Sequence, residues 1–244
     1  MTASHTTVSG QEEPEPDMYD DTMWSNVEGH VKGFDIYGKG KTLAERAAWD
    51  FLKTIPEGEH VPELVTILPG FIIGDYITGG IASSPALIKS LMMNTLPGIP
   101  RLSFPCVDVH NVVEAHFKAI FTPAANGQRF LLVSESLYLI DMCDILREGL
   151  AKDYDYEIAE SEINRCPIYL ISWFSHDAKA TLDKWDHEQA FDTSKSKDIL
   201  GMEYRDVRQS VMDTAMTLMQ AGAVETKARV QVAEGQEAKE MEVP

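Results

Sequence analysis

Tyr37 and Lys41 are the residues whose types and spacing most clearly could do chemistry. A spacing of four residues places both side chains on one face of a helix, close enough to interact. An ammonium group beside a phenol favours the phenolate, so the phenol can exchange a proton with a carbonyl oxygen near neutral pH. The pair could therefore act as a general acid or base, although an isolated Tyr-x-x-x-Lys is usually a solvated helix face.

The residues around this pair predict the helix that would position it. Apolar side chains recur at helical spacing between residues 34 and 54, and Pro56 and Gly58 end the pattern. Gly38 and Gly40 lie beside the pair, and each glycine in a helix interior costs about 0.8–1 kcal/mol relative to alanine. We therefore expect the helical turn that holds Tyr37 against Lys41 to be less rigid than in a helix without these glycines.

Two apolar runs predict strands, and the segments between and after them predict helices. Residues 63–68 and 129–133 lack polar alternation, as expected for strands of a parallel sheet that is buried on both faces. Helices are expected at 83–93, 112–121, 140–150, 194–200 and 207–220. This alternation indicates an α/β fold. Two strands are too few for a self-sufficient doubly wound sheet, and the pattern of residues 151–190 predicts no clear element.

Five stretches of the sequence, in order, resemble extended short-chain dehydrogenase/reductases. The branch they resemble contains dihydroflavonol reductases, cinnamoyl-CoA reductases and yeast-type methylglyoxal reductases. The stretches are 2–4 with 7–8, 19–24, 37–51, 64–74 with 83–85, and 107–116 with 127–130. Residues 192–201 resemble the late helix of the family, and the whole resemblance covers nearly all of residues 1–222.

The resemblance implies a catalytic set and an activity. It matches Ser4 with the serine that hydrogen-bonds the substrate carbonyl, Tyr37 with the general acid, and Lys41 with the lysine that tunes the tyrosine and binds the nicotinamide ribose. The implied protein is an NAD(P)-dependent oxidoreductase that reduces a ketone or aldehyde or oxidises the corresponding alcohol. Sugar-nucleotide epimerases and hydroxysteroid dehydrogenases are alternatives, but epimerases keep the segment between serine and tyrosine short. A non-catalytic remnant that acts as a binding protein is the alternative from another class.

The resemblance also implies a cofactor site, of which one part is missing from the sequence. It assigns the binding of NADP or NAD, with NADP slightly favoured, to Tyr37, Lys41, Pro69, Ile72 and Ser84. Pro69 and Ile72 would lie beside the nicotinamide ring and Ser84 near the phosphates. Members of the family begin with a strand and a Gly-x-x-Gly-x-x-Gly turn that holds the pyrophosphate at a helix N-terminus. None of the 16 glycines forms this pattern. We therefore expect the chain to be the back part of such an enzyme: an incomplete gene model, a fragment, or a product that lost its cofactor half.

The implied fold is the C-terminal portion of a Rossmann-type doubly wound parallel sheet with a smaller mixed substrate-binding lobe. Residues 1–74 and 107–135 would belong to the sheet domain. Residues 75–106 and 136–222 would form the substrate lobe, and the polar residues 223–244 would form a disordered acidic tail.

Composition narrows the class of partner. A net charge of −18 and a pI of about 4.7 leave no basic stripe that could bind nucleic acid.

The N-terminus has no apolar signal-peptide core, and the apolar stretch 64–73 is too short to cross a bilayer. The wide spacing of three cysteines favours reduced thiols. His187 and Glu188 begin a zinc motif, but Phe191 replaces its second histidine, so no metal is expected. We expect a cytoplasmic monomer that binds a small-molecule carbonyl substrate, and neither nucleic acid nor a membrane.

Overall fold

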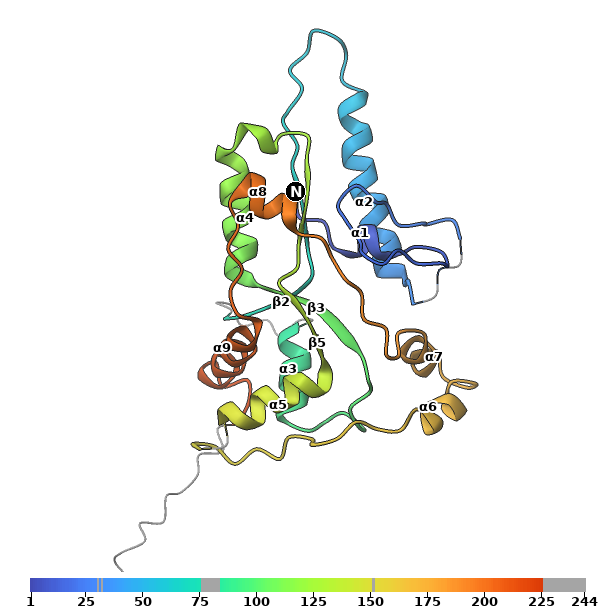
Figure 1. Ribbon diagram of the computed structural model, residues 1–244, viewed down its shortest axis with the longest axis vertical. Coiled ribbons are helices and arrows are strands. Elements are labelled where there is room, and N and C mark those ends of the chain that lie inside the picture. The colour runs from blue at the N-terminus through green and yellow to red at the C-terminus, as the bar shows by residue number, and fades with distance from the viewer. Residues whose placement is uncertain (30, 32, 76–83, 151, 226–244) are drawn as a thin grey trace, which may run out of the picture.

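Figure 1 shows the computed structural model, which describes residues 1–29, 31, 33–75, 84–150 and 152–225. Within these residues strands and helices alternate, so the expected α/β class is confirmed. Helices flank a small parallel sheet in the upper part of Figure 1 and surround a mixed sheet in the lower part.

The upper sheet carries the N-terminal segment. Strands β1 (Thr66–Pro69) and β4 (Arg129–Leu132) pair in parallel, with Ile67 opposite Phe130. Residues 1–5 run parallel to β1 along its other edge. There the Ala3 amide donates to the Ile67 carbonyl at 2.7 Å, and the Ile67 amide donates to the Met1 carbonyl at 2.9 Å. Ser4 therefore lies at the carboxyl end of this sheet, beside the end of β1.

Gly70 takes the chain from the upper sheet into the lower one. After it, β2 (Phe71–Ile73) pairs in parallel with β3 (Ser103–Asp108), and β3 pairs antiparallel with β5 (Glu135–Tyr138). A Cβ atom at position 70 would lie 2.1 Å from the carbonyl oxygen of Pro105. Only glycine allows this close approach of the two backbones.

Helices cover both faces of the upper sheet (Figure 1). Helix α2 (Ile36–Lys53), next to the short α1 (Thr6–Ser9), lies on one side, and α4 (Val109–Phe121) and α8 (Ser194–Leu200) lie on the other. The turn η1 (Pro123–Ala125) leads from α4 into β4. Asp35 begins α2 because its side chain accepts a hydrogen bond from the Gly38 amide at 2.9 Å, which is an ordinary N-cap.

Three helices pack against the lower sheet and share the largest core. These are α3 (Ser84–Met92), α5 (Leu139–Leu150) and α9 (Val207–Gln220). Their apolar stripes meet in side chains with no more than 1% exposure, among them Ile88, Leu91, Met142, Leu146 and Val211. This burial is the main force that holds the lower lobe together.

Two helices lie where the sequence predicted no element. Helices α6 (Arg165–Ile171) and α7 (His176–Asp183) contact each other at the lower right of Figure 1. No residue of α6 is buried. An apolar stripe toward the core is therefore absent there, which explains why residues 151–190 showed only weak periodicity.

The structure differs from the sequence-based expectation in the sheet and at the tail. Strands β3 and β5 were not predicted, because both are partly exposed and β3 contains Pro105. Val224, placed in the expected disordered tail, is only 2% exposed and packs with α9. Residues 226–244 of that tail lie outside the described residues.

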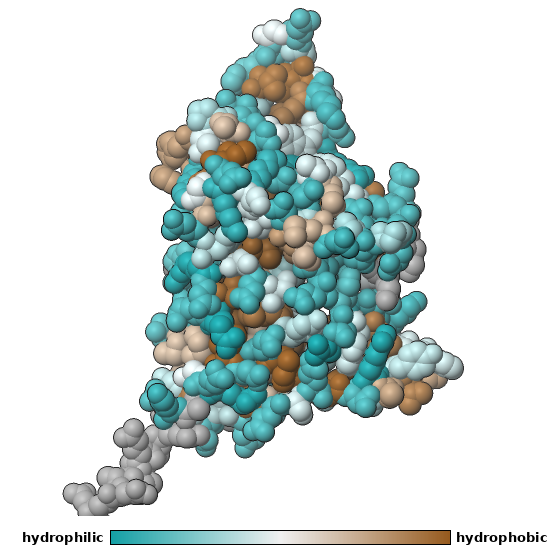
Figure 2. Space-filling model, viewed as in Figure 1, coloured by the Kyte–Doolittle hydropathy of each residue, from teal (hydrophilic) through white to brown (hydrophobic). Residues whose placement is uncertain are grey.

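The outer face of α4 is apolar and open. Val113, Phe117, Ile120 and Phe121 are each 62–76% exposed. Figure 2 shows hydrophobic patches that interrupt a mostly hydrophilic surface. A contiguous stripe of this kind is uncommon on a monomer, so this face of α4 is suited to packing against further protein. No helix among the described residues is long and apolar enough to cross a membrane.

Candidate active site

Tyr37 and Lys41 lie on one face of α2, as their spacing predicted. The Lys41 Nζ atom is 5.9 Å from the centroid of the Tyr37 ring, within cation–π distance. Tyr37 is 58% exposed. Gly38 has a packing role that the sequence did not reveal, because a Cβ atom there would lie 2.4 Å from the Phe34 ring. Gly40 has no such constraint, since a Cβ atom there would meet nothing within 4 Å.

Ser4 is buried at the end of the N-terminal strand. The next residue ties this strand to β1, because the His5 amide donates to the Pro69 carbonyl at 2.9 Å. The Ser4 hydroxyl oxygen accepts a bond from the Thr6 amide at 3.3 Å. That bond does not use the hydroxyl hydrogen, which can donate to another group.

A cavity of about 240 Å³ lies at the carboxyl end of the upper sheet. Its wall contains Tyr37 together with His5 and Thr6, the two residues that follow Ser4. Phe71 and Phe104 form an aromatic side of the cavity, with their ring centroids 4.9 Å apart. Ligands of open α/β sheets bind at this end of the strands.

The polar side of the cavity comes from the segment after α7. Lys184, His187 and Gln189 all line it. The Lys184 ammonium pairs with the Asp35 carboxylate at 3.1 Å. Although burial opposes the change, the Gly38 amide and Lys184 hold the pKa of Asp35 below its ordinary value. At neutral pH the rim of the cavity therefore carries an ion pair in which the charges of Lys184 and Asp35 cancel.

His5 lies in the same wall as a neutral imidazole. Burial lowers its pKa to about 4, although the Pro69 carbonyl, 3.3 Å from Nδ1, favours the protonated form. The His5 ring also stacks edge-on against Phe191 at 5.8 Å. The residue after the candidate serine is thus a fixed, uncharged polar group that faces the cavity.

Of the sequence-predicted site residues, Tyr37 lines the cavity, whereas Ser4, Lys41 and Pro69 do not. Ser4 directly precedes the lining residue His5, and Lys41 lies one helical turn after Tyr37 on α2. Ile72 and Ser84 are bonded to each other, because the Ser84 hydroxyl donates to the Ile72 carbonyl. Neither of these two residues is among those that line the cavity.

Sequence reasoning missed Arg129, whose side chain holds residues 21–24 against the sheet. Its guanidinium donates to the carbonyls of Asp21 (2.8 Å) and Met23 (2.6 Å) and to the Thr7 hydroxyl (2.9 Å). It also stacks 3.8 Å above the Trp24 ring. A signal was present, because an arginine that opens an apolar strand must find partners when it is buried.

Comparison with known proteins supports the predicted family. No protein-family model matches the sequence. The chain is 29% identical over 220 residues to cinnamoyl-CoA reductase CAD2 of Medicago truncatula, covering 89% of this chain and 59% of that protein. It is 30% identical over 194 residues to the NADPH-dependent methylglyoxal reductase GRE2 of Saccharomyces cerevisiae, covering 76% of this chain and 51% of that protein. The chain thus spans about half the length of these curated relatives.

A solved structure shows the same fold. The crystal structure of Gre2 from Candida albicans aligns with a TM-score of 0.69 and 25% identity. The alignment covers 91% of this chain and 64% of that one. These relatives confirm the resemblance to the reductase branch and the Rossmann-type fold.

Proposed function

Because this chain is homologous to extended short-chain dehydrogenase/reductases of the carbonyl-reducing branch, we propose that it carries the proton-transfer and substrate-binding side of an NADP(H)-dependent carbonyl reductase. The observation that carries this proposal is the cavity, whose lining includes Tyr37 and the two residues that follow Ser4. A phenol beside an ammonium group is suited to proton exchange with a carbonyl oxygen.

Two side chains would act on the substrate oxygen, and a third would act on Tyr37. Tyr37 gives it a proton in the reductive direction and takes that proton back in the oxidative direction. Ser4 donates a hydrogen bond to the same oxygen. Its hydroxyl hydrogen can do so because the Ser4 oxygen only accepts in its bond with the Thr6 amide. Lys41 stabilises the phenolate that Tyr37 becomes.

Residues that would hold the nicotinamide end of the cofactor are present in this sequence, whereas the pyrophosphate end has no counterpart in it. NADP(H) supplies the hydride when it is bound. Lys41 is half-buried on α2 and would hold the ribose hydroxyls, while Pro69 and Ile72 would lie beside the ring. Ser84 would have to release the Ile72 carbonyl to reach a phosphate. No glycine-rich turn is present for the pyrophosphate.

The substrate is proposed to be a compact ketone or aldehyde. A volume of about 240 Å³ is below the roughly 300–1,000 Å³ of sites for drug-sized ligands. Phe71 and Phe104 suit an apolar group, and His5 and Gln189 suit a polar one.

The test is NADPH consumption by the chain joined behind the part of the Candida albicans protein that it does not match. We expect turnover of methylglyoxal and of small aryl aldehydes, and no turnover of bulky ketones. Absence of carbonyl-dependent NADPH consumption, with the protein folded, would favour the non-catalytic binding protein instead.

A further inference from the structure

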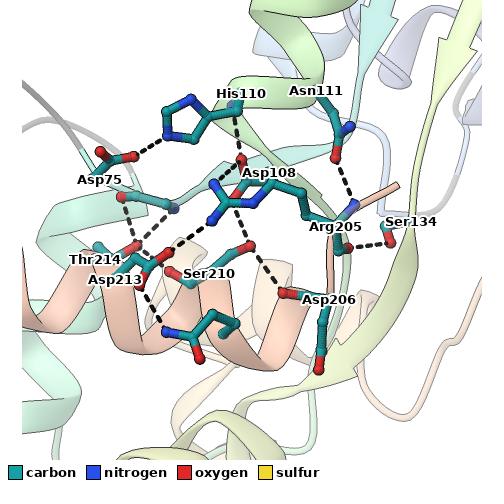
Figure 3. A network of polar contacts seen from close by, with 12 residues as sticks. Asp75, Asp108, His110, Asn111, Ser134, Arg205, Asp206, Ser210, Asp213 and Thr214 are labelled. Carbon is teal, nitrogen blue, oxygen red and sulfur yellow. Dashed lines mark hydrogen bonds and ion pairs between the residues drawn. The ribbon is translucent and has the colours of Figure 1, made fainter. Parts of the chain in front are cut away.

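The end of β2 is bonded to the C-terminal helix α9 by side chains that the chemistry above does not use (Figure 3). The Thr214 hydroxyl oxygen accepts a bond from the Gly74 amide at 2.8 Å. It lies 2.9 Å from the Gly74 carbonyl and 2.8 Å from the Ser210 carbonyl, either of which can accept its one hydrogen. A single side chain thus lies within hydrogen-bond distance of both backbone polar groups of Gly74.

The backbone at Gly74 has a conformation that needs this support. Its φ is +123°, which side chains rarely adopt, and a Cβ atom there would lie 3.0 Å from the Asp108 carboxylate. Glycine is therefore required, and glycine gives the chain more freedom than any other residue. The bonds from Thr214 remove that freedom in the folded protein.

The Asp108 carboxylate joins α9 to the sheet from the other side. It is fully buried at the end of β3, where it pairs with Ile73 in register. It accepts bonds from the His110 amide at 2.8 Å, the Ser210 hydroxyl at 2.5 Å and the Arg205 guanidinium at 3.2 Å. A buried carboxylate is costly unless it is paired in this way, so α9, α4 and β3 meet at a fixed point.

The neighbours of Gly74 are held as well. The Ile72 carbonyl accepts a bond from Ser84 at the start of α3, and Asp75 pairs with His110 at 2.5 Å. Residues 72, 74 and 75 thus each contact a different helix, residue 75 through its side chain. This segment includes Ile72, which is proposed to lie beside the nicotinamide ring.

We propose that Thr214 and Ser210 are positioning residues that hold residues 72–75 in place for the nicotinamide end of the cofactor. The proposal rests on the proposed function, because it assumes that Ile72 contacts the ring. Thr214 and Ser210 themselves touch neither substrate nor cofactor. They act through Gly74 and Asp108.

The first test measures the bond itself, by amide hydrogen exchange in the full 244-residue chain. Thr214→Val keeps the shape of the side chain and removes the hydroxyl, so the Gly74 amide should exchange at least about tenfold faster. Thr214→Ser should restore the protection. The matched control is Thr217→Val, because the Thr217 hydroxyl donates to the Asp213 carbonyl of its own helix and to no other group among the described residues. Equal exchange rates at Gly74 in Thr214→Val and Thr217→Val would overturn the proposal.

The second test measures positioning, with reduced nicotinamide mononucleotide as the probe because it lacks the pyrophosphate link. We expect Thr214→Val to weaken binding of the mononucleotide several-fold in an NMR titration, and Thr214→Ser and Thr217→Val to bind it as the parent does.

If Thr214→Val speeds exchange at Gly74 but binds the mononucleotide normally, the positioning role is wrong and the proposed function stands. If the parent chain does not bind the mononucleotide, the proposed function itself fails. If Thr214→Val does not fold, the comparison is made with Ser210→Ala, which should show the same two effects.

Discussion

Glu45 of α2 and Arg129 of β4 form a buried ion pair, with the Glu45 Oε1 atom 2.8 Å from Nε and the Oε2 atom 3.0 Å from Nη2. The Glu45 side chain is fully buried, and the Thr66 hydroxyl donates to the same carboxylate at 2.6 Å. Although burial opposes the change, Arg129 and Thr66 hold the pKa of Glu45 below its ordinary value. Because Glu45 lies one turn after Lys41 on α2, the pair fixes the helix that carries the candidate catalytic residues.

Glu45→Gln should lower the free energy of unfolding by about 3–5 kcal/mol, since it leaves the buried charge of Arg129 without its partner. Urea unfolding followed by circular dichroism measures this change. Glu114→Gln is the control, because Glu114 pairs with Lys118 at 2.7 Å on the partly exposed surface of α4. Exposed pairs contribute about 0–1 kcal/mol. Similar losses in the two variants would show that burial of the Glu45 pair is not what holds α2.

His5 should make the protein less stable as the pH falls. Burial lowers its folded-state pKa to about 4, whereas a histidine in an unfolded chain titrates near pH 6.5. Between these values the unfolded state binds a proton that the folded state does not, so the free energy of unfolding falls as the pH drops from about 6.5 to 4. His5→Asn should reduce this loss between pH 7 and pH 5 in urea titrations. His60→Asn, at an exposed position, should leave the loss unchanged, and identical pH profiles for His5→Asn and the parent would contradict the prediction.

Two glycines should respond to alanine with opposite signs. Gly70→Ala would place a Cβ atom 2.1 Å from the Pro105 carbonyl oxygen, whereas Gly40→Ala meets nothing within 4 Å. We expect Gly70→Ala to cost about 1–3 kcal/mol or more through overpacking. Gly40→Ala should stabilise α2 by up to about 1 kcal/mol, since alanine is the better helix former. The midpoint temperatures of thermal unfolding of the two variants and the parent measure these changes. A lower midpoint for Gly40→Ala than for the parent would show that the helix needs that glycine.

The 244-residue chain alone should bind NADPH weakly. No glycine-rich turn holds the pyrophosphate, so the adenosine end should add little to the affinity of the nicotinamide end. Titration of tryptophan fluorescence with NADPH and with reduced nicotinamide mononucleotide measures both affinities, which should agree within about tenfold. Micromolar binding of NADPH would reveal a pyrophosphate site of a different kind.

The elements that the sequence predicted are those with a full apolar stripe or a clear end signal. Helix α8 begins and ends where its pattern and Gly201 indicate, and α9 begins after Asp206, which caps it. Strand β5 was missed because only Leu137 of its four residues is buried. A partly exposed strand of this kind can be identified only from its pairing with another strand, and the partner of β5 is β3, which lies about 30 residues earlier in the chain.

The residues of the candidate site could also be predicted only where their interactions are local in the sequence. Tyr37 and Lys41 could be identified because their interaction is local to one helix. The cavity walls at Phe104 and Lys184 could not, because tertiary packing brings them to α2 from far along the sequence. The Glu45–Arg129 pair was missed for the same reason, since its partners are 84 residues apart.

The role of Tyr37 as the general acid is tested most directly by carbonyl-dependent NADPH consumption of the chain joined to a nucleotide-binding half. Tyr37→Phe keeps the ring and removes the hydroxyl, so turnover should fall by a factor of about 10²–10⁴. Lys41→Ala should be similarly damaging and should also raise the KM for NADPH, whereas Ser4→Ala should cost less because it removes one hydrogen bond and not the proton source. Turnover by Tyr37→Phe at the parental rate would contradict the catalytic assignment.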